Sequence, residues 1–238
     1  MSAEGTLGGR PARLVLVDDH ELARDGLQDI LTDVPDVEIV GEAADGREAI
    51  ELCRRVRPDL VLMDLRMPRM DGLEATREIK REHPKIGVLV MTMHENPDYL
   101  LEAIRAGAAG YVLKDAPQHE VITAIRQVLG GESPLDPELA ARLLRRLAAE
   151  EGERRGGPAR GERVQRQVPY VEPLTPRERE VLGLMKLGHT NRMIAQTLVI
   201  SPGTAKNHVE HIIQKLGVSD RTQAVVRALE LGILELSE

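Results

Sequence analysis

Five polar residues stand where they could act together on a phosphoryl group. Asp18 and Asp19 follow one short apolar run, and Asp64 follows another. Thr92 and Lys114 follow two further runs of the same kind. Carboxylates crowded into one cleft repel each other unless a cation lies among them, and a small set of oxygen ligands suits Mg²⁺. A carboxylate nucleophile, a divalent metal and a positioned ammonium are the requirements for forming an aspartyl phosphate.

The surrounding elements decide whether these residues can meet. Short apolar runs alternate with helical stretches, which is typical of a parallel sheet covered on both faces. Right-handed crossovers then predict a doubly wound, five-stranded α/β fold that binds ligands beyond the carboxyl ends of its strands. A polar residue at one strand end is most simply a solvated side chain, whereas polar residues at four strand ends of one domain favour a functional site. The predicted strands are 13–17, 37–41, 60–63, 86–91 and 109–113, and the predicted helices are 20–33, one from about 45, 72–82, 98–106 and 117–129.

The composition excludes several classes of protein. The 238 residues include no Trp, no Phe and three Tyr, so the core must be aliphatic, and aromatic stacking on single-stranded nucleic acid is disfavoured. Cys53 is the single cysteine, which excludes an intrachain disulfide and a thiolate zinc cluster. No apolar run approaches the roughly 18–20 residues that span a bilayer, and the first residues lack a signal peptide's apolar stretch. We therefore expect a cytoplasmic protein with no membrane partner.

The second half of the chain has a different character. Residues 1–130 carry 16 Lys and Arg against 24 Asp and Glu, whereas residues 173–238 carry 8 against 7. Residues 136–150 form a predicted amphipathic helix, and the Gly- and charge-rich residues 151–167 a predicted flexible linker. Beyond the linker the pattern is all helical.

Start and stop signals divide this tail into four helices. Thr175 and Glu178 flank Pro176 as in a capping box, Ser201 precedes a proline, and Gly217 ends the helix that follows. The tight turn between the second and third helices predicts a helix-turn-helix domain.

The third tail helix is the candidate recognition helix. Lys206 suits a phosphate or a guanine edge, Asn207 suits adenine, and Thr204 with the helix N-terminus suits a phosphate. The candidate DNA contacts are Thr204, Lys206, Asn207, His208 and Glu210. The last helix offers Val225, Val226, Leu229 and Gly232 as a self-packing face, although burial inside the small domain accounts for some of these residues.

Two sets of motifs resemble known bacterial domains. The motifs VDD at 17–19, LMDLRMPRMDG at 62–72, Thr92 and GYVLKD at 110–115 resemble the receiver domain of two-component response regulators. Residues 174–225 resemble the DNA-binding domain of the LuxR, FixJ and NarL type. The resemblance implies a receiver at 12–131, a helix and linker at 132–170, and a helix-turn-helix domain at 171–238.

The resemblance also implies a role for each receiver residue. Asp64 would be the phosphorylated residue, and Asp19 and Asp64 would bind Mg²⁺ directly. Asp18 would act on the metal through water, and the backbone carbonyl of Arg66 would complete the set. The phosphoryl group would be held by Lys114 and Thr92, with Tyr111 as a second switch residue. From the residues alone, Tyr111 is better explained as an amphipathic ring at the sheet edge.

The resulting hypothesis is a transcription regulator rather than an enzyme. A partner sensor histidine kinase would phosphorylate Asp64, and phosphorylation would favour homodimers on double-stranded promoter DNA. Two alternatives remain open on sequence. One is a small phosphotransferase or phosphatase that uses Asp64 covalently, and the other is a DNA-binding protein that works without phosphorylation.

Overall fold

The computed structural model describes residues 10–93, 97–134 and 172–234. The chain divides into two compact units, Met1–Leu135 and Asp136–Glu238. The predicted helix at 136–150 and linker at 151–167 lie outside the described residues. Within the described parts of the chain, no helix has both the length and the apolar character needed to cross a membrane.

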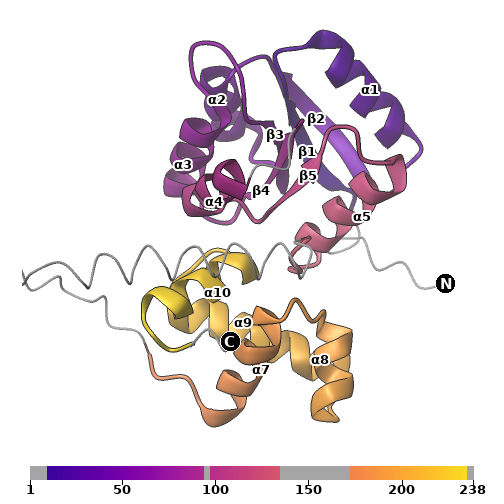
Figure 1. Cartoon of the computed structure of the whole chain (residues 1–238). Helices are drawn as coiled ribbons and strands as arrows, with labels where there is room; N and C mark the ends of the chain where they lie inside the picture. Colours follow the sequence, from indigo (N-terminus) through magenta and orange to yellow (C-terminus); the bar gives the residue numbers. More distant parts are fainter. Residues whose placement is uncertain (1–9, 94–96, 135–171, 235–238) are drawn as a thin grey trace, which may run out of the picture. The chain divides into compact units, whose positions relative to one another are not determined.

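The first unit is a five-stranded parallel sheet in the order β2-β1-β3-β4-β5, with helices on both faces (Figure 1). This confirms the predicted doubly wound α/β fold. The strands are β1 (Ala12–Val17), β2 (Val37–Ala43), β3 (Leu60–Asp64), β4 (Gly87–Thr92) and β5 (Gly110–Leu113). The helices are α1 (Glu21–Thr32), α2 (Gly46–Val56), α3 (Gly72–Glu82), α4 (Pro97–Ala106) and α5 (Gln118–Leu129).

Alternating strand residues build two cores, one on each face of the sheet. On β1, Val15 and Val17 pack into the cluster that contains residues of α2, α3 and α4. Leu14 and Leu16 point the other way, into the cluster that contains residues of α1 and α5. Because both faces are covered, the central strands are apolar at successive positions, as the sequence pattern requires.

Within residues 172–234 of the second unit, all of the regular secondary structure is helical, as predicted. Its described helices are α7 (Pro176–Lys186), α8 (Asn191–Leu198), α9 (Pro202–Leu216) and α10 (Arg221–Glu230). Each begins at a side chain that accepts a hydrogen bond from the first turn, and the caps are Thr175, Thr190, Ser201 and Asp220. The capping box at Thr175 and Glu178 is complete, and α9 ends at Gly217 in the left-handed conformation, so both sequence signals are confirmed.

Small differences from prediction lie at the ends of elements. Strand β2 runs two residues beyond the predicted end, because Glu42 and Ala43 continue to pair with β1 after a register shift between Leu14 and Val15. Strand β3 includes Asp64, so this carboxylate belongs to the last residue of the strand instead of the loop after it.

Candidate functional site

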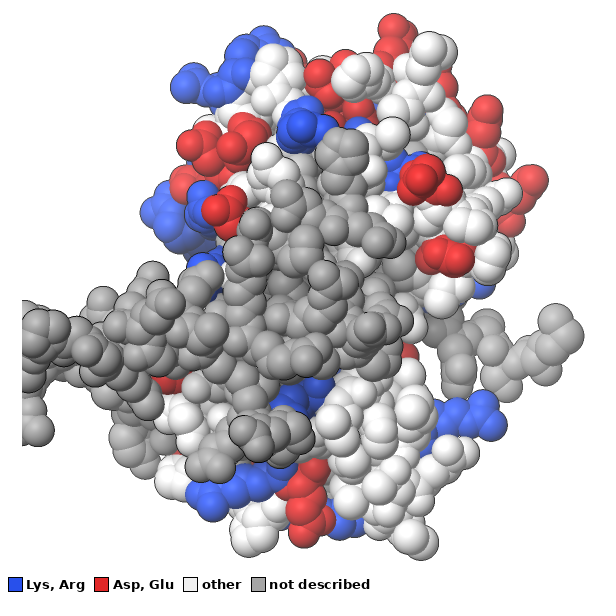
Figure 2. All heavy atoms as spheres, in the orientation of Figure 1, with Lys and Arg blue, Asp and Glu red and all other residues white. Residues whose placement is uncertain are grey.

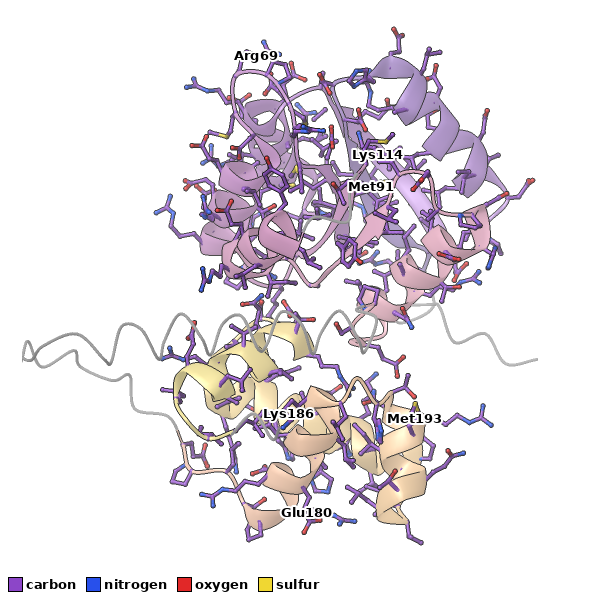
Figure 3. All side chains as sticks on the ribbon, viewed as in Figure 1. Arg69, Met91, Lys114, Glu180, Lys186 and Met193 are labelled. Atoms are coloured by element: carbon purple, nitrogen blue, oxygen red, sulfur yellow. The ribbon has the colours of Figure 1, made fainter. Side chains whose placement is uncertain are left out.

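The carboxyl edge of the sheet gathers the acidic residues and the lysine. Strands β1 and β3 are parallel neighbours that pair Val17 with Met63, so Asp18 and Asp64 come next on adjacent strands. Strand β5 ends at Leu113, and the backbone N–H of Lys114 donates to the carbonyl of Thr92, 2.8 Å away. Residues far apart in the sequence therefore meet at one edge, where Figure 3 labels Lys114.

The ammonium of Lys114 joins two of the carboxylates. Its Nζ lies 2.6 Å from Oδ2 of Asp18 and 3.0 Å from Oδ2 of Asp64. Both aspartates are buried, and the lysine side chain is 16% exposed. Burial lowers the pKa of Lys114, but the hydrogen bonds to Asp18 and Asp64 more than offset it, so the pKa is raised and the ammonium stays charged.

Asp64 is held in a different electrostatic balance. Burial raises its pKa, and the negative charge of Asp18 raises it further. Hydrogen bonds from Lys114 and from the backbone N–H of Arg66 oppose this without cancelling it. The ionised form of the Asp64 carboxylate therefore carries a cost in free energy, which favours neutralisation by a cation or by reaction.

Asp19 supplies an oxygen with unused bonding capacity. Its Oδ1 is buried and accepts no hydrogen bond of good geometry, although His20 Nδ1 lies 2.9 Å away. Ligand atoms of Asp18, Asp19 and His20 all lie within 4.8 Å of one another. A buried carboxylate oxygen without a hydrogen-bond partner, beside a second carboxylate, is suited to binding a cation.

The donor set fits Mg²⁺ better than a transition metal. Carboxylate oxygens of Asp18, Asp19 and Asp64 are hard ligands, which magnesium prefers. Asp64 does not belong to the tight group formed by Asp18, Asp19 and His20, and is linked to Asp18 through Lys114 instead. His20 was not foreseen beside the acidic pair. Its side chain is 74% exposed, and nitrogen is a poor ligand for magnesium.

The other predicted receiver residues lie around this edge. Thr92 is the last residue of β4 and is half-buried, and the exposed Met93 follows it. Tyr111 is half-buried and packs against the core cluster on the α2, α3 and α4 face. Arg66 is exposed, and the metal-binding role of its carbonyl stays a prediction. The switch roles of Thr92 and Tyr111 stay predictions.

The predicted DNA contacts share the solvent side of α9. Thr204, Lys206, Asn207 and Glu210 are exposed and His208 is half-buried, whereas the helix packs inward through Ala205, Val209, Ile212 and Leu216. Ser201 Oγ accepts from the N–H of Thr204 at 3.0 Å, which fixes the first turn. The side chains of Lys206 and Glu210 lie 3.9 Å apart, each more than half exposed.

Two basic residues of this unit serve its own structure. Lys215 donates to Oε2 of Glu178 at 2.9 Å and is 17% exposed. The buried Arg221 donates to Oδ1 of Asn191 at 3.1 Å and to the carbonyl of His189. Neither partnership was predicted, because the partners lie more than 29 residues apart in the sequence.

The surface adds little that would single out a DNA-binding face. Both signs of charge are visible on each unit in Figure 2. Of the expected self-packing residues, Val225 and Val226 are buried, Leu229 is half-buried and Gly232 is exposed. The candidate contacts therefore rest on the helix-turn-helix geometry and the exposed side of α9.

Two family models match the chain. Residues 14–126 match the response regulator receiver domain, and residues 172–228 match the bacterial regulatory proteins of the luxR family. The matches coincide with the two units and follow the order that the sequence motifs predict.

Curated relatives match over nearly the whole length. The chain is 39% identical over 226 residues to the transcriptional regulatory protein DegU of Brevibacillus brevis, covering 92% of this chain and 94% of DegU. It is 41% identical over 216 residues to the transcriptional regulatory protein LiaR of Bacillus subtilis strain 168, covering 91% of this chain and 96% of LiaR.

Solved structures give the same result. A LuxR-family two-component response regulator from Aurantimonas sp. SI85-9A1 is 38% identical with a TM-score of 0.53, covering 60% of this chain and 99% of that one. The response regulator RcsB of Salmonella typhimurium is 25% identical with a TM-score of 0.52, covering 94% and 100%. The chain therefore belongs to the two-component response regulators of the NarL/FixJ class, with a receiver domain followed by a LuxR-type DNA-binding domain.

Proposed function

We propose that this response regulator is switched by phosphorylation of Asp64. The observation that carries the proposal is the position of Lys114, whose ammonium contacts Asp64 and Asp18 at the carboxyl edge of the sheet. A carboxylate nucleophile with a cation already in contact has the electrostatic partner that an incoming phosphoryl group needs. The donor would be the phosphohistidine of a partner sensor kinase.

The residues of the chain perform the transfer as follows. An oxygen of Asp64 attacks the phosphorus, the P–N bond to the kinase histidine breaks, and that imidazole takes up a proton. Lys114 then pairs with the phosphoryl oxygens, and Thr92, the last residue of β4, would donate its hydroxyl to them. Mg²⁺, when bound by Asp19, Asp64 and the Arg66 carbonyl with Asp18 acting through water, would neutralise phosphoryl charge.

Phosphorylation would be read out at DNA by the second domain. We assign the receiver to 12–131, a connecting segment to 132–170 and the DNA-binding domain to 171–238. Thr204, Lys206, Asn207, His208 and Glu210 would face the major groove of promoter DNA from α9. Homodimers of the phosphorylated protein would pair two half-sites, and Tyr111 would report the change at the sheet edge. The protein would work in the cytoplasm, and as a regulator it would turn over no substrate of its own.

The test is to locate the phosphate. The full chain is incubated with acetyl phosphate and Mg²⁺, and intact mass and peptide mapping follow incorporation. Asp64→Asn should abolish the hydroxylamine-labile acyl phosphate without loss of fold. Asp115→Asn is the matched control, because Asp115 is an exposed carboxylate next to Lys114. Normal phosphate on Asp64→Asn would refute the assignment.

A further inference from the structure

The loop after Asp64, residues 65–71, belongs to the reaction site through its backbone. The N–H of Arg66 donates to the Asp64 carboxylate, and the carbonyl of the same residue is the proposed metal ligand. The shape of this loop therefore decides where two of the site's polar groups point.

The base of the loop is closed by backbone contacts. Gly72 N–H donates to the Leu65 carbonyl at 2.9 Å, and Asp71 caps α3 by accepting from Glu74 N–H at 2.8 Å. A Cβ at Gly72 would lie 2.0 Å from the Asp64 carbonyl oxygen, so no side chain fits there. The start of α3 is thus seated directly on the backbone of Asp64.

The far end of the loop is fastened to the start of α2. Arg69 forms an ion pair with Oδ2 of Asp45, and Gly46 N–H donates to the Met70 carbonyl at 3.3 Å. Asp45 is 1% exposed, and its Oδ1 already accepts from the N–H groups of Arg47 and Glu48 at 2.8 and 3.0 Å. Arg69 is the cation that partners the other oxygen of this buried carboxylate, and Figure 3 shows it on the outer turn of the loop.

Arg69 also has a backbone conformation that a residue with a Cβ adopts only at a cost. Its φ is +68°, and the other described non-glycine residues with positive φ are Arg57 and Val199. Those two follow α2 and α8 as C-caps, where the left-handed conformation is common. Arg69 instead lies in mid-loop, so its conformation needs another source of stabilisation, which the contact with Asp45 supplies.

We propose that the Asp45–Arg69 ion pair holds the phosphoacceptor loop in the conformation that phosphorylation of Asp64 requires. Both are positioning residues, since neither contacts the Asp64 carboxylate. The inference rests on the proposed function of Asp64. Loss of the pair would free Arg69 to leave the left-handed conformation, and the loop would no longer fix the backbone of Arg66, whose carbonyl is the proposed metal ligand.

Two variants remove the pair with little other change. Asp45→Asn keeps an N-cap for α2, because Asn caps helices about as well as Asp. Arg69→Gln removes the charge from a side chain that is 62% exposed and should fold normally. Arg69→Lys retains the charge as a rescue variant. Asp36→Asn is the control, because it breaks a receiver ion pair with Arg126, at 2.8 Å, on the opposite side of the sheet.

The rate of phosphorylation of the full chain by acetyl phosphate is measured against Mg²⁺ concentration. Asp45→Asn and Arg69→Gln should each raise the Mg²⁺ concentration for half-maximal rate about tenfold, the usual size of an effect from residues that support metal ligands. The double variant should be no worse than either single one, because the residues act as a unit. Arg69→Lys should recover most of the loss, and Asp36→Asn should behave as wild type.

Hydrogen exchange without metal gives a readout independent of the reaction. Peptides covering residues 65–72 should exchange faster in Asp45→Asn and Arg69→Gln and at the wild-type rate in Asp36→Asn. An unchanged Mg²⁺ requirement in folded Arg69→Gln would overturn the inference and leave the pair a purely structural contact. Phosphate at a residue other than Asp64 in the wild type would instead overturn the proposed function itself.

Discussion

The ammonium of Lys114 lies 3.0 Å from the carboxylate of Asp64, the residue proposed to accept the phosphoryl group. The same nitrogen lies 2.6 Å from Asp18. The lysine thus holds two buried carboxylates together before any phosphate arrives, and a phosphoryl group on Asp64 would compete with Asp18 for it. This competition links the chemistry at Asp64 to the arrangement of the sheet edge.

Lys114→Ala should therefore lower both stability and reactivity. Two buried carboxylates would lose their shared cation, and the free energy of unfolding of the receiver at pH 7 should fall by roughly 1–3 kcal/mol. Phosphorylation by acetyl phosphate should slow about a hundredfold. Urea unfolding followed by tyrosine fluorescence reports mainly the receiver, since Tyr99 and Tyr111 are two of the three tyrosines and there is no tryptophan. Lys85 is exposed, so Lys85→Ala is the control and should change neither the free energy of unfolding nor the rate of phosphorylation.

Asp64→Asn should stabilise the receiver at neutral pH. The pKa of Asp64 is raised, chiefly by burial, so its neutral form stabilises the fold at low pH, and that stability is lost as pH rises through the raised pKa. The neutral amide avoids this loss, and we expect a gain of about 0.5–2 kcal/mol at pH 7. Urea unfolding at several pH values should show that the gain in unfolding free energy shrinks as the pH falls toward the ordinary pKa of a carboxyl group. A gain that grows on acidification would contradict the assigned direction.

Glu178→Gln should destabilise the second domain at neutral pH and have no such effect in acid. Burial alone would raise the pKa of Glu178, but hydrogen bonds from Lys215 and Thr175 lower it below its usual value. The ionised form thus contributes stability above the ordinary carboxyl pKa, and this stability is lost as pH falls through the lowered one. We expect a loss of about 1–3 kcal/mol at pH 7 that disappears in acid.

Hydrogen exchange in peptides covering α7 and α9 measures this loss within the full chain. Glu180→Gln is the matched control on the same helix. Glu180 is 55% exposed and pairs with Arg177 at the surface, so its loss should change protection little. Equal effects of the two variants would mean that the Glu178–Lys215 pair has no special role.

The two lysines on α9 should contribute differently to DNA affinity and to its salt dependence. Lys206 is 58% exposed, whereas Lys215 is 17% exposed and pairs with Glu178. Lys206→Gln should weaken binding and reduce the slope of log affinity against log salt by about one if it meets a phosphate. Lys215→Gln retains a hydrogen-bond donor for Glu178 and should leave the slope unchanged. Fluorescence anisotropy with one labelled duplex measures both, and equal slopes would remove Lys206 from the interface.

Local signals in the sequence predicted the fold well. The capping box at Thr175 and the stop at Gly217 act within one turn of their helices, so they can be read without the tertiary structure. The apolar strands likewise predict a covered parallel sheet, and the strand-end rule places Asp18, Asp64 and Lys114 at one edge. Where each side chain points at that edge was not predictable from spacing.

Pairings between distant segments escaped prediction. Lys215 counts as a free cation in the sequence, and its partner Glu178 lies 37 residues earlier, on a helix whose packing against α9 has no local signal. Arg69 and Asp45 meet because two loops converge, and periodicity says nothing about loops. The left-handed conformation of Arg69 was equally unpredictable, because a glycine in the sequence indicates a positive φ and an arginine does not.

The affinity of the full chain for DNA before and after phosphorylation tests the central claim most directly. A duplex is first enriched from a random pool with acetyl phosphate and Mg²⁺ present, and its Kd is then measured with and without the phosphodonor for wild type and Asp64→Asn. The account predicts that phosphodonor lowers the Kd of the wild type at least fivefold and leaves that of Asp64→Asn unchanged. A Kd that does not respond in the wild type, or that falls equally in Asp64→Asn, would contradict control of DNA binding through Asp64.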